Sequence, residues 1–192
     1  MTDAPPLSRR DELLAAVLDH LATTGAGDLS LRAVAEAVGT SHRMLSYHFG
    51  SRDGLVLAVV QAVEAAQQQT AALLAADTGM SPADQMRALW AQVSHPALAP
   101  NVRLFFALYA RGLAGEEPAA RLLDGDIARW VEPSARAAHE RLGATLDEAR
   151  TDVRLGVAVV RGLLLDLLAT GERDAVDRAF ERFVRLWEDG TR

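Results

Sequence analysis

Hydrophobic residues recur along most of this chain every three or four positions, the spacing of one face of an α-helix. In residues 30–38, for example, Leu31, Val34, Ala35 and Val38 follow this spacing. No stretch alternates apolar and polar residues for more than a few positions, so the pattern does not predict strands. The sequence therefore predicts an all-α fold of about nine helices. The expected ranges are 8–24, 30–38, 41–49, 51–76, 81–94, 100–114, 117–142, 146–170 and 172–189.

Residues at the ends of these ranges support the expected boundaries. Ser8 with Asp11 three residues later resembles a capping box, and Ser81-Pro82 pairs an N-cap serine with a proline in the first turn. The glycines at 25 and 27 stop the first helix, and those at 143 and 171 separate the last three. Pro133 predicts a kink within 117–142. Residues 100–114 are apolar nearly all round, which predicts a helix buried on most sides.

The two short helices in 30–49 have the layout of a helix-turn-helix. Gly39 can adopt the positive φ that a tight turn needs, and Ser41 is a good N-cap for the second helix. Leu45 and Phe49 should face the core, which leaves a polar face outward. In a helix-turn-helix the second helix enters the DNA major groove.

Residues 39–41, 45–49 and 51–55 read Gly-Thr-Ser, Leu-Ser-Tyr-His-Phe and Ser-Arg-Asp-Gly-Leu. Over residues 8–60 this pattern resembles the signature of the tetracycline-repressor (TetR) family. The resemblance implies a DNA-binding domain over residues 1–53 and a helical ligand-binding and dimerisation domain over 54–192.

Three departures from the family signature affect the DNA-binding surface. Ser46 stands where the family usually has tyrosine, with Tyr47 beside it as a substitute. Arg43 and Met44 replace small residues, so the operator sequence of relatives does not carry over. Arg52 replaces a lysine and keeps its charge.

The candidate DNA-binding residues are polar or basic positions on or beside the second short helix. Arg43 can grip guanine and Met44 can touch a thymine methyl group, whereas the resemblance implies phosphate contacts for Tyr47, His48 and Arg52. The full candidate set is Arg9, Arg10, Arg32, Ser41, His42, Arg43, Met44, Ser46, Tyr47, His48 and Arg52. The alternative interpretation is an ordinary solvated helix face.

Charge argues mildly against a nucleic-acid partner. The net charge is −6, and residues 1–53 hold five arginines against seven acids. DNA binding therefore requires the arginines to gather on one side of the head, because a local patch is what contacts phosphate.

Catalytic and metal-binding patterns do not emerge from the sequence. There is no cysteine, and His139-Glu140 lacks the second histidine of a zinc-protease motif because residue 143 is Gly143. We expect no cofactor, no metal and no enzymatic activity. Residues 155–169, the longest apolar run, include Arg161 and Asp166 and are too short to cross a bilayer. We expect a cytoplasmic protein without a membrane contact.

Five of the ten aromatic residues lie between positions 90 and 130, where the resemblance implies a ligand pocket among the fourth to seventh helices. A mainly apolar pocket with a few polar anchors predicts a mainly apolar effector. Candidate ligand-binding residues are Met86, Trp90, Phe105, Phe106, Tyr109, Trp130 and Arg161. Arg111 is a further candidate anchor. Plain core packing remains the alternative for the aromatics, and an ion pair with a neighbouring acid remains the alternative for Arg161.

The last two expected helices, about 146–189, carry excess apolar surface. Ala158 and Gly162, four residues apart, allow close helix approach, and the resemblance implies a four-helix interface of a homodimer. We therefore expect a homodimeric regulator, most simply a repressor that a small molecule releases from a palindromic double-stranded operator. The alternatives are an activating or ligand-independent regulator of this fold, or an all-helical carrier or enzyme with a vestigial head.

Overall fold

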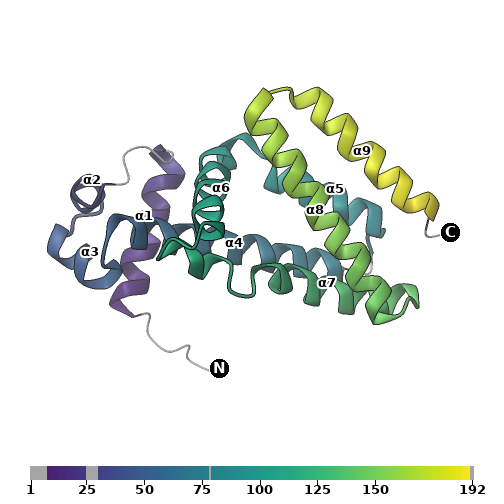
Figure 1. Ribbon diagram of the computed structural model, residues 1–192, viewed down its shortest axis with the longest axis horizontal. Helices are drawn as coiled ribbons and strands as arrows, with labels where there is room; N and C mark the ends of the chain where they lie inside the picture. Colours follow the sequence, from purple (N-terminus) through teal and green to yellow (C-terminus); the bar gives the residue numbers. More distant parts are fainter. Residues whose placement is uncertain (1–7, 25–29, 78, 191–192) are drawn as a thin grey trace.

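A computed structural model describes residues 8–24, 30–77 and 79–190, and all statements of structure refer to these residues (Figure 1). They contain nine α-helices, two short 3₁₀ helices and no strand, which confirms the all-α prediction. The elements are α1 (Arg9–Thr24), α2 (Leu31–Ala37), α3 (His42–Phe49), α4 (Arg52–Ala76), α5 (Pro82–Val93), η1 (Pro96–Leu98), α6 (Ala99–Leu113), η2 (Ala119–Leu122), α7 (Asp126–Leu142), α8 (Leu146–Thr170) and α9 (Arg173–Gly190).

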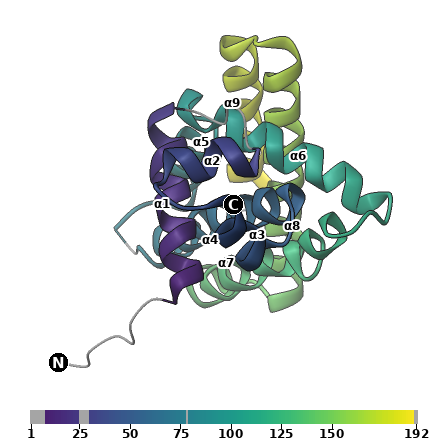
Figure 2. The ribbon, with the colours of Figure 1, turned by 90° about the vertical axis from the view of Figure 1, so that its left-hand side faces the viewer.

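The helices form a small head and a larger body that share one long helix. Figure 1 shows α1, α2 and α3 gathered at one end, with α4 running from them into the body. The view in Figure 2 looks onto the head, with α1, α2 and α3 toward the viewer. We call α1–α3 the head and α5–α9 the body.

Local sequence accounts for most of the helix ends. The hydroxyl of Ser41 accepts a hydrogen bond from the backbone N–H of Met44 at 3.1 Å, and Ser51 accepts one from Gly54 at 3.1 Å. Thr145 and Glu148 form a complete capping box at the start of α8. These side chains satisfy backbone donors that a helix leaves unpaired at its N-terminus. The expected caps are therefore confirmed, including Ser8 before α1.

Three apolar clusters hold the fold. The first joins the head to the first half of α4 and to α6 and η2, through Val17, Leu45, Leu55 and Phe105 among others. The second packs α5, α8 and α9 around Trp90 and Phe180. The third joins α7 to α8 through Val131 and Ala149. The head therefore shares its core with α4 and α6.

Residues 117–142 differ from the single helix that the sequence predicts. They form η2 and then α7, which begins only at Asp126. Gly125 adopts a left-handed conformation with φ of 65°, which ends helical continuity there. Ala119 and Leu122 of η2 gain burial in the first cluster by leaving the axis of α7.

Helix α6 is buried or half-buried over most of its surface, as predicted, and exposes one stripe that ends at Leu113. In α4, Ala66 continues the helical spacing of Leu55, Val59 and Val63 but is exposed. The expected turn at residues 25–27 lies outside the described residues. Within the described part of the chain, no helix is long and apolar enough to cross a bilayer.

Candidate functional site

The join between α3 and α4 fixes how the candidate recognition helix α3 projects from the head. Gly50 ends α3 with φ of 74°, which favours glycine. A Cβ atom on Gly54 would lie 2.0 Å from the carbonyl oxygen of Phe49, so only glycine fits this approach of the two helices. Leu45 and Phe49 are buried in the first cluster, as expected. The sequence at the join thus locks α3 onto the start of α4 with its other face outward.

The outward face of α3 is polar. Tyr47 is 81 % exposed, and Ser41, His42 and Arg43 are also exposed. Met44, Ser46 and His48 are half-buried. The structure therefore brings together most of the expected base-reading positions on one surface.

The side chain of His48 is not oriented as a contact with a DNA phosphate would require. Its Nε2 atom is buried and makes no hydrogen bond, and its ring lies edge-on to that of Tyr47 with centroids 5.0 Å apart. A buried nitrogen cannot reach a phosphate while the helix holds this rotamer. The phosphate-contact prediction for His48 thus depends on its other ring nitrogen.

The five candidate DNA-binding arginines differ in whether an acidic or aromatic side chain lies close to them. Arg9 pairs with Glu12 at 2.8 Å, and the guanidinium of Arg10 lies over the ring of Phe49 at 5.1 Å. Arg52 lies 3.7 Å from Asp53. Arg32 and Arg43 are exposed and pair with no acid among the described residues. These two are the head cations whose charge is least compensated locally.

Asp53 connects the start of α4 to the body. Its carboxylate accepts a hydrogen bond from Arg111 of α6 at 2.8 Å, and Arg111 also pairs with Glu116. The Arg111 hydrogen bond is the main reason why the pKa of Asp53 lies below its ordinary value. Arg111 therefore forms ion pairs with Asp53 and Glu116. It does not line the cavity, although the sequence made it a candidate anchor of the ligand pocket.

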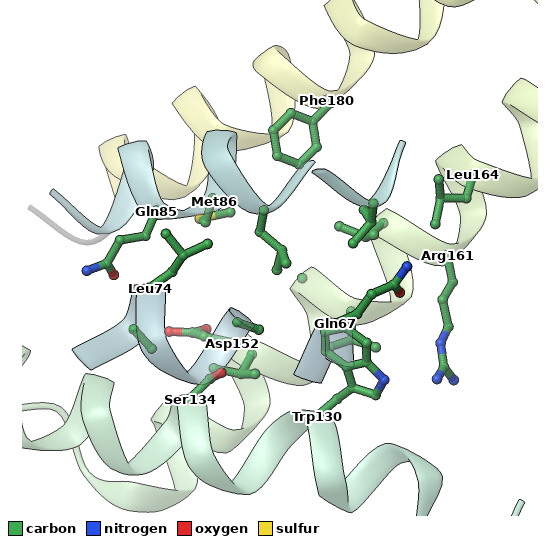
Figure 3. Close-up of a pocket in the computed structure, with 18 of the residues that line it drawn as sticks. Gln67, Leu74, Gln85, Met86, Trp130, Ser134, Asp152, Arg161, Leu164 and Phe180 are labelled. Carbon is green, nitrogen blue, oxygen red and sulfur yellow. The ribbon is translucent and has the colours of Figure 1, made fainter. Parts of the chain in front are cut away.

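A cavity of about 240 Å³ lies in the body, bounded by helices α4 to α9. Its wall is mostly apolar, and Figure 3 shows the side chains around it. Five of the seven predicted ligand residues line this cavity: Met86, Phe105, Phe106, Trp130 and Arg161. The expected pocket region is therefore present, and it extends onto α8 and α9.

Trp90 and Tyr109 lie behind the wall. Trp90 stacks on Phe180 with ring centroids 4.8 Å apart and donates a hydrogen bond from Nε1 to Asp177 at 2.8 Å. It is 6 % exposed and belongs to the second apolar cluster. Tyr109 packs behind Phe105, with centroids 5.4 Å apart. The helical spacing in the sequence does not distinguish a residue that lines the cavity from a residue that packs one layer behind the cavity wall.

The polar part of the wall comes mainly from α4, α7 and α8. Trp130 donates a hydrogen bond from Nε1 to Glu64 at 3.1 Å, and Arg161 lies over the ring of Phe105 at 5.2 Å. Arg141 donates to the backbone oxygens of Ala75 and Met80. Arg161 therefore lies in the cavity wall over an aromatic ring.

Sequence reasoning missed the polar wall residues of α4. Glu64 and Gln67 continue a stripe in which Val60, Val63, Ala71 and Leu74 also line the cavity. That stripe has helical spacing and is readable from the sequence. Gln67 begins a run of three glutamines that makes the middle of α4 polar, yet its side chain is buried. No group of three or more metal-ligating side chains occurs in the described ranges.

The chain resembles known regulators in sequence and in fold. The sequence model of bacterial regulatory proteins of the tetR family matches residues 13–59. The HTH-type transcriptional regulator BetI of Stenotrophomonas maltophilia (strain R551-3) is 30 % identical over 81 residues, 42 % of this chain and 41 % of that protein. The chain thus aligns with less than half the length of this curated relative.

Solved structures of regulators share the fold over nearly the whole chain. A transcriptional regulator from Rhodococcus sp. Rha1 has a TM-score of 0.71 and 20 % identity, covering 95 % of this chain and 97 % of that one. BioQ, solved with its natural double-stranded DNA operator, has a TM-score of 0.57 and 21 % identity, covering 96 % and 98 %. A TetR regulator from Legionella pneumophila has a TM-score of 0.68 and 14 % identity, covering 95 % and 98 %.

A helix-turn-helix head on an all-helical body is the architecture that this chain shares with solved TetR transcriptional regulators. Within it, residues 13–59 of the head and the start of α4 match the sequence model of the bacterial regulatory proteins of the tetR family.

Proposed function

We propose that this chain is a cytoplasmic, homodimeric repressor that binds a palindromic operator through α3. A small, mainly apolar effector in the body cavity releases it. The observation that carries this proposal is the pairing of an exposed polar recognition face with an apolar cavity whose walls, α4 and α6, contribute to the same apolar cluster as the head.

The DNA-binding part rests on the exposed end of α3. Arg43 projects from the first turn of the helix without a local acid, so its guanidinium is available for two hydrogen bonds to guanine. Arg32 supplies a second uncompensated charge for the phosphate backbone. BioQ, which shares the fold and was solved with its double-stranded DNA operator, supports DNA binding by this chain.

The dimer part rests on the outer face of α8. Leu155 and Leu165 are both more than half exposed, and the exposed small residues Ala158 and Gly162 lie between them along the same face. A Cβ atom on Gly162 would meet nothing within 4 Å, so a partner helix could approach closely there. An apolar face with a central groove of small residues suits a copy of itself across a two-fold axis. Leu186 of α9 is also more than half exposed.

The regulatory part is a linkage argument. A dimer presents two recognition helices at one separation, and its operator requires half-sites at that spacing. An effector that favours another separation must weaken DNA binding, and DNA must weaken effector binding by the same factor. Phe105 lines the cavity and also belongs to the cluster that holds the head. We propose that movement of this wall is transmitted to the head through the shared cluster.

DNA binding can be tested with a labelled fragment from upstream of the gene for this chain. We expect Arg43→Ala to weaken binding by about 1–3 kcal/mol and to relax specificity at one base pair per half-site. Arg136→Ala makes the same charge change on an exposed position of α7 and should leave binding unchanged. Equal binding by wild type and Arg43→Ala contradicts base reading by this arginine.

Light scattering tests the assembly. The full chain should have about twice the mass of the 20.6 kDa protomer at micromolar concentration. Because Leu165 is exposed, Leu165→Glu should keep the helical circular dichroism spectrum while shifting the mass toward one protomer. A wild-type monomer contradicts the proposed dimer.

A further inference from the structure

One polar side chain in the wall of the cavity is both buried and unpartnered. Gln67 of α4 is 7 % exposed and lines the cavity. Its amide makes no hydrogen bond with any residue that the structure describes. Its neighbours Gln68 and Gln69 on the same helix are half-buried and exposed, respectively. Because neither polar atom of this amide is enclosed by protein, the amide is open to the cavity and can pair with a ligand there.

The other polar groups of the wall are either more exposed or already engaged. The indole N–H of Trp130 is donated to Glu64, and Arg141 is held by two backbone oxygens. Gln85 donates to the backbone oxygen of Asp77 at 2.7 Å. In Figure 3 the amide of Gln67 lies on the same side of the cavity as Trp130 and Arg161, whereas Gln85 and Met86 lie on the other side. Gln67 is therefore the free hydrogen-bonding point on that side.

The surroundings of Gln67 select for an uncharged group. Val63, Phe105 and Phe106 supply apolar wall close to this side, so an ion would be stripped of water without compensation. Glu64 and Arg161 carry opposite charges in the same wall, so an ion of either sign attracted by one is repelled by the other. A carboxamide offers one acceptor and two donors, which match the donor and acceptor of the Gln67 side chain.

We propose that the effector site recognises an uncharged carboxamide group on a compact apolar body, and that this group pairs with the amide of Gln67. The inference rests on the proposed function, because it assigns the polar group of the effector that the body cavity receives. A cavity of about 240 Å³ restricts the apolar body to a small one. Gln67 is then a specificity-determining residue, and the apolar wall supplies most of the affinity.

Calorimetric titration with four probes of similar size tests this assignment: hexanamide, methyl hexanoate, hexanoate and hexylammonium. Methyl hexanoate accepts hydrogen bonds but donates none, and the last two probes are ions. We expect hexanamide to bind tightest, with methyl hexanoate about tenfold weaker because one side of the Gln67 amide stays unpaired. Tighter binding of either ion overturns the inference.

Gln67→Leu removes the amide at nearly constant volume. In this variant hexanamide and methyl hexanoate should bind within about twofold of each other, and the protein should unfold at no lower urea concentration than wild type. Gln69→Leu, an exposed glutamine on the same helix, is the matched control and should keep the tenfold preference. If Gln67→Leu fails to fold, Gln67→Met offers a more flexible side chain for the same measurement.

Three outcomes separate the inference from the proposed function. A tenfold preference for hexanamide that survives Gln67→Leu overturns the inference and leaves the proposed function standing. A preference that depends on Gln67, without release of the upstream DNA fragment, supports the inference and contradicts effector control. Failure of all four probes to bind overturns the inference, and DNA binding then remains a separate test of the head.

Discussion

The two halves of α4 lie in opposite surroundings. In the first half, residues 55–60 are six consecutive buried residues, packed into the cluster that also holds α1, α2 and α3. In the second half, one stripe of side chains faces the body cavity, while Leu73 is 66 % exposed on the other side. A close-packed segment transmits displacement, because its neighbours have no room to relax. A segment beside a cavity can change its packing when the cavity fills. One helix thus combines a rigid end at the head with an adaptable end at the candidate effector site.

The largest expected difference between the halves is the cost of removing a leucine side chain. Leu55 is fully buried, so Leu55→Ala should lower the free energy of unfolding by about 2–5 kcal/mol through lost burial and a new cavity. Leu73→Ala, on the exposed side of the second half, should stay within about 0.5 kcal/mol of wild type. Urea unfolding followed by circular dichroism measures both. Similar losses in the two variants would mean that the halves do not differ in packing.

Substitutions that enlarge a side chain also test the difference in packing between the two halves of α4. Val59 is fully buried against the head, whereas Val63, one turn later, lines the cavity. Val59→Phe should cost about 1–3 kcal/mol of stability by overpacking. Val63→Phe should cost less, because its ring can enter the cavity, and it should weaken hexanamide binding by filling that space. Equal destabilisation by the two substitutions contradicts an open cavity beside Val63.

The ion pair between Asp53 and Arg111 anchors the first half of α4 to α6. Hydrogen bonding to Arg111 lowers the pKa of Asp53 in the folded state, so the pair stabilises the protein above the unfolded pKa of about 3.9. That stabilisation is lost as the pH falls through this region toward the lower folded value. Arg111→Gln should therefore lower stability at pH 7 only slightly, because the pair is partly exposed. Wild type and variant should converge near pH 3.

Urea midpoints at pH 7 and pH 3 measure this convergence. Arg121→Gln removes an exposed pair within one segment, with Glu117, and should leave the midpoint unchanged at both values. A difference between wild type and Arg111→Gln that persists at pH 3 would show that the arginine stabilises the fold by packing and not through its charge.

The smallest expected effect is a change in how a ligand quenches tryptophan fluorescence. Trp130 lines the cavity beside the second half of α4, whereas Trp90 is packed one layer behind it against Phe180. Quenching of tryptophan emission by hexanamide should therefore persist in Trp90→Phe and fall in Trp130→Phe. Both substitutions remove a single indole donor, so circular dichroism serves as the check that each variant is folded. Loss of quenching in Trp90→Phe alone would place the ligand outside this cavity.

Comparison of residues 143–171 with residues 117–125 shows which features local sequence can predict. Helix α8 spans the predicted 146–170 because a capping box begins it and a glycine in the left-handed conformation ends it. Those signals act within one turn of the chain. Residues 117–125 have the composition of a helix, yet they fold as η2 and a break at Gly125. Burial of Ala119 and Leu122 against distant parts of the first cluster outweighs local helix preference there.

The sequence by itself determined the all-α class, the head and its α3–α4 join, because these depend on periodicity, caps and glycines between near neighbours. The family resemblance, and not the residue pattern, located the pocket region, where five of the ten aromatic residues lie. Only the tertiary structure decided which of the candidate residues form the cavity wall. Trp90 packs behind the wall, and Arg111 forms an ion pair with Asp53 instead of lining the cavity. It also decided that Gln67, within a run of three glutamines, is buried with its amide unpaired. The physical reason is that a helix sequence specifies its faces, whereas the neighbours of each face are set by helices distant in the chain.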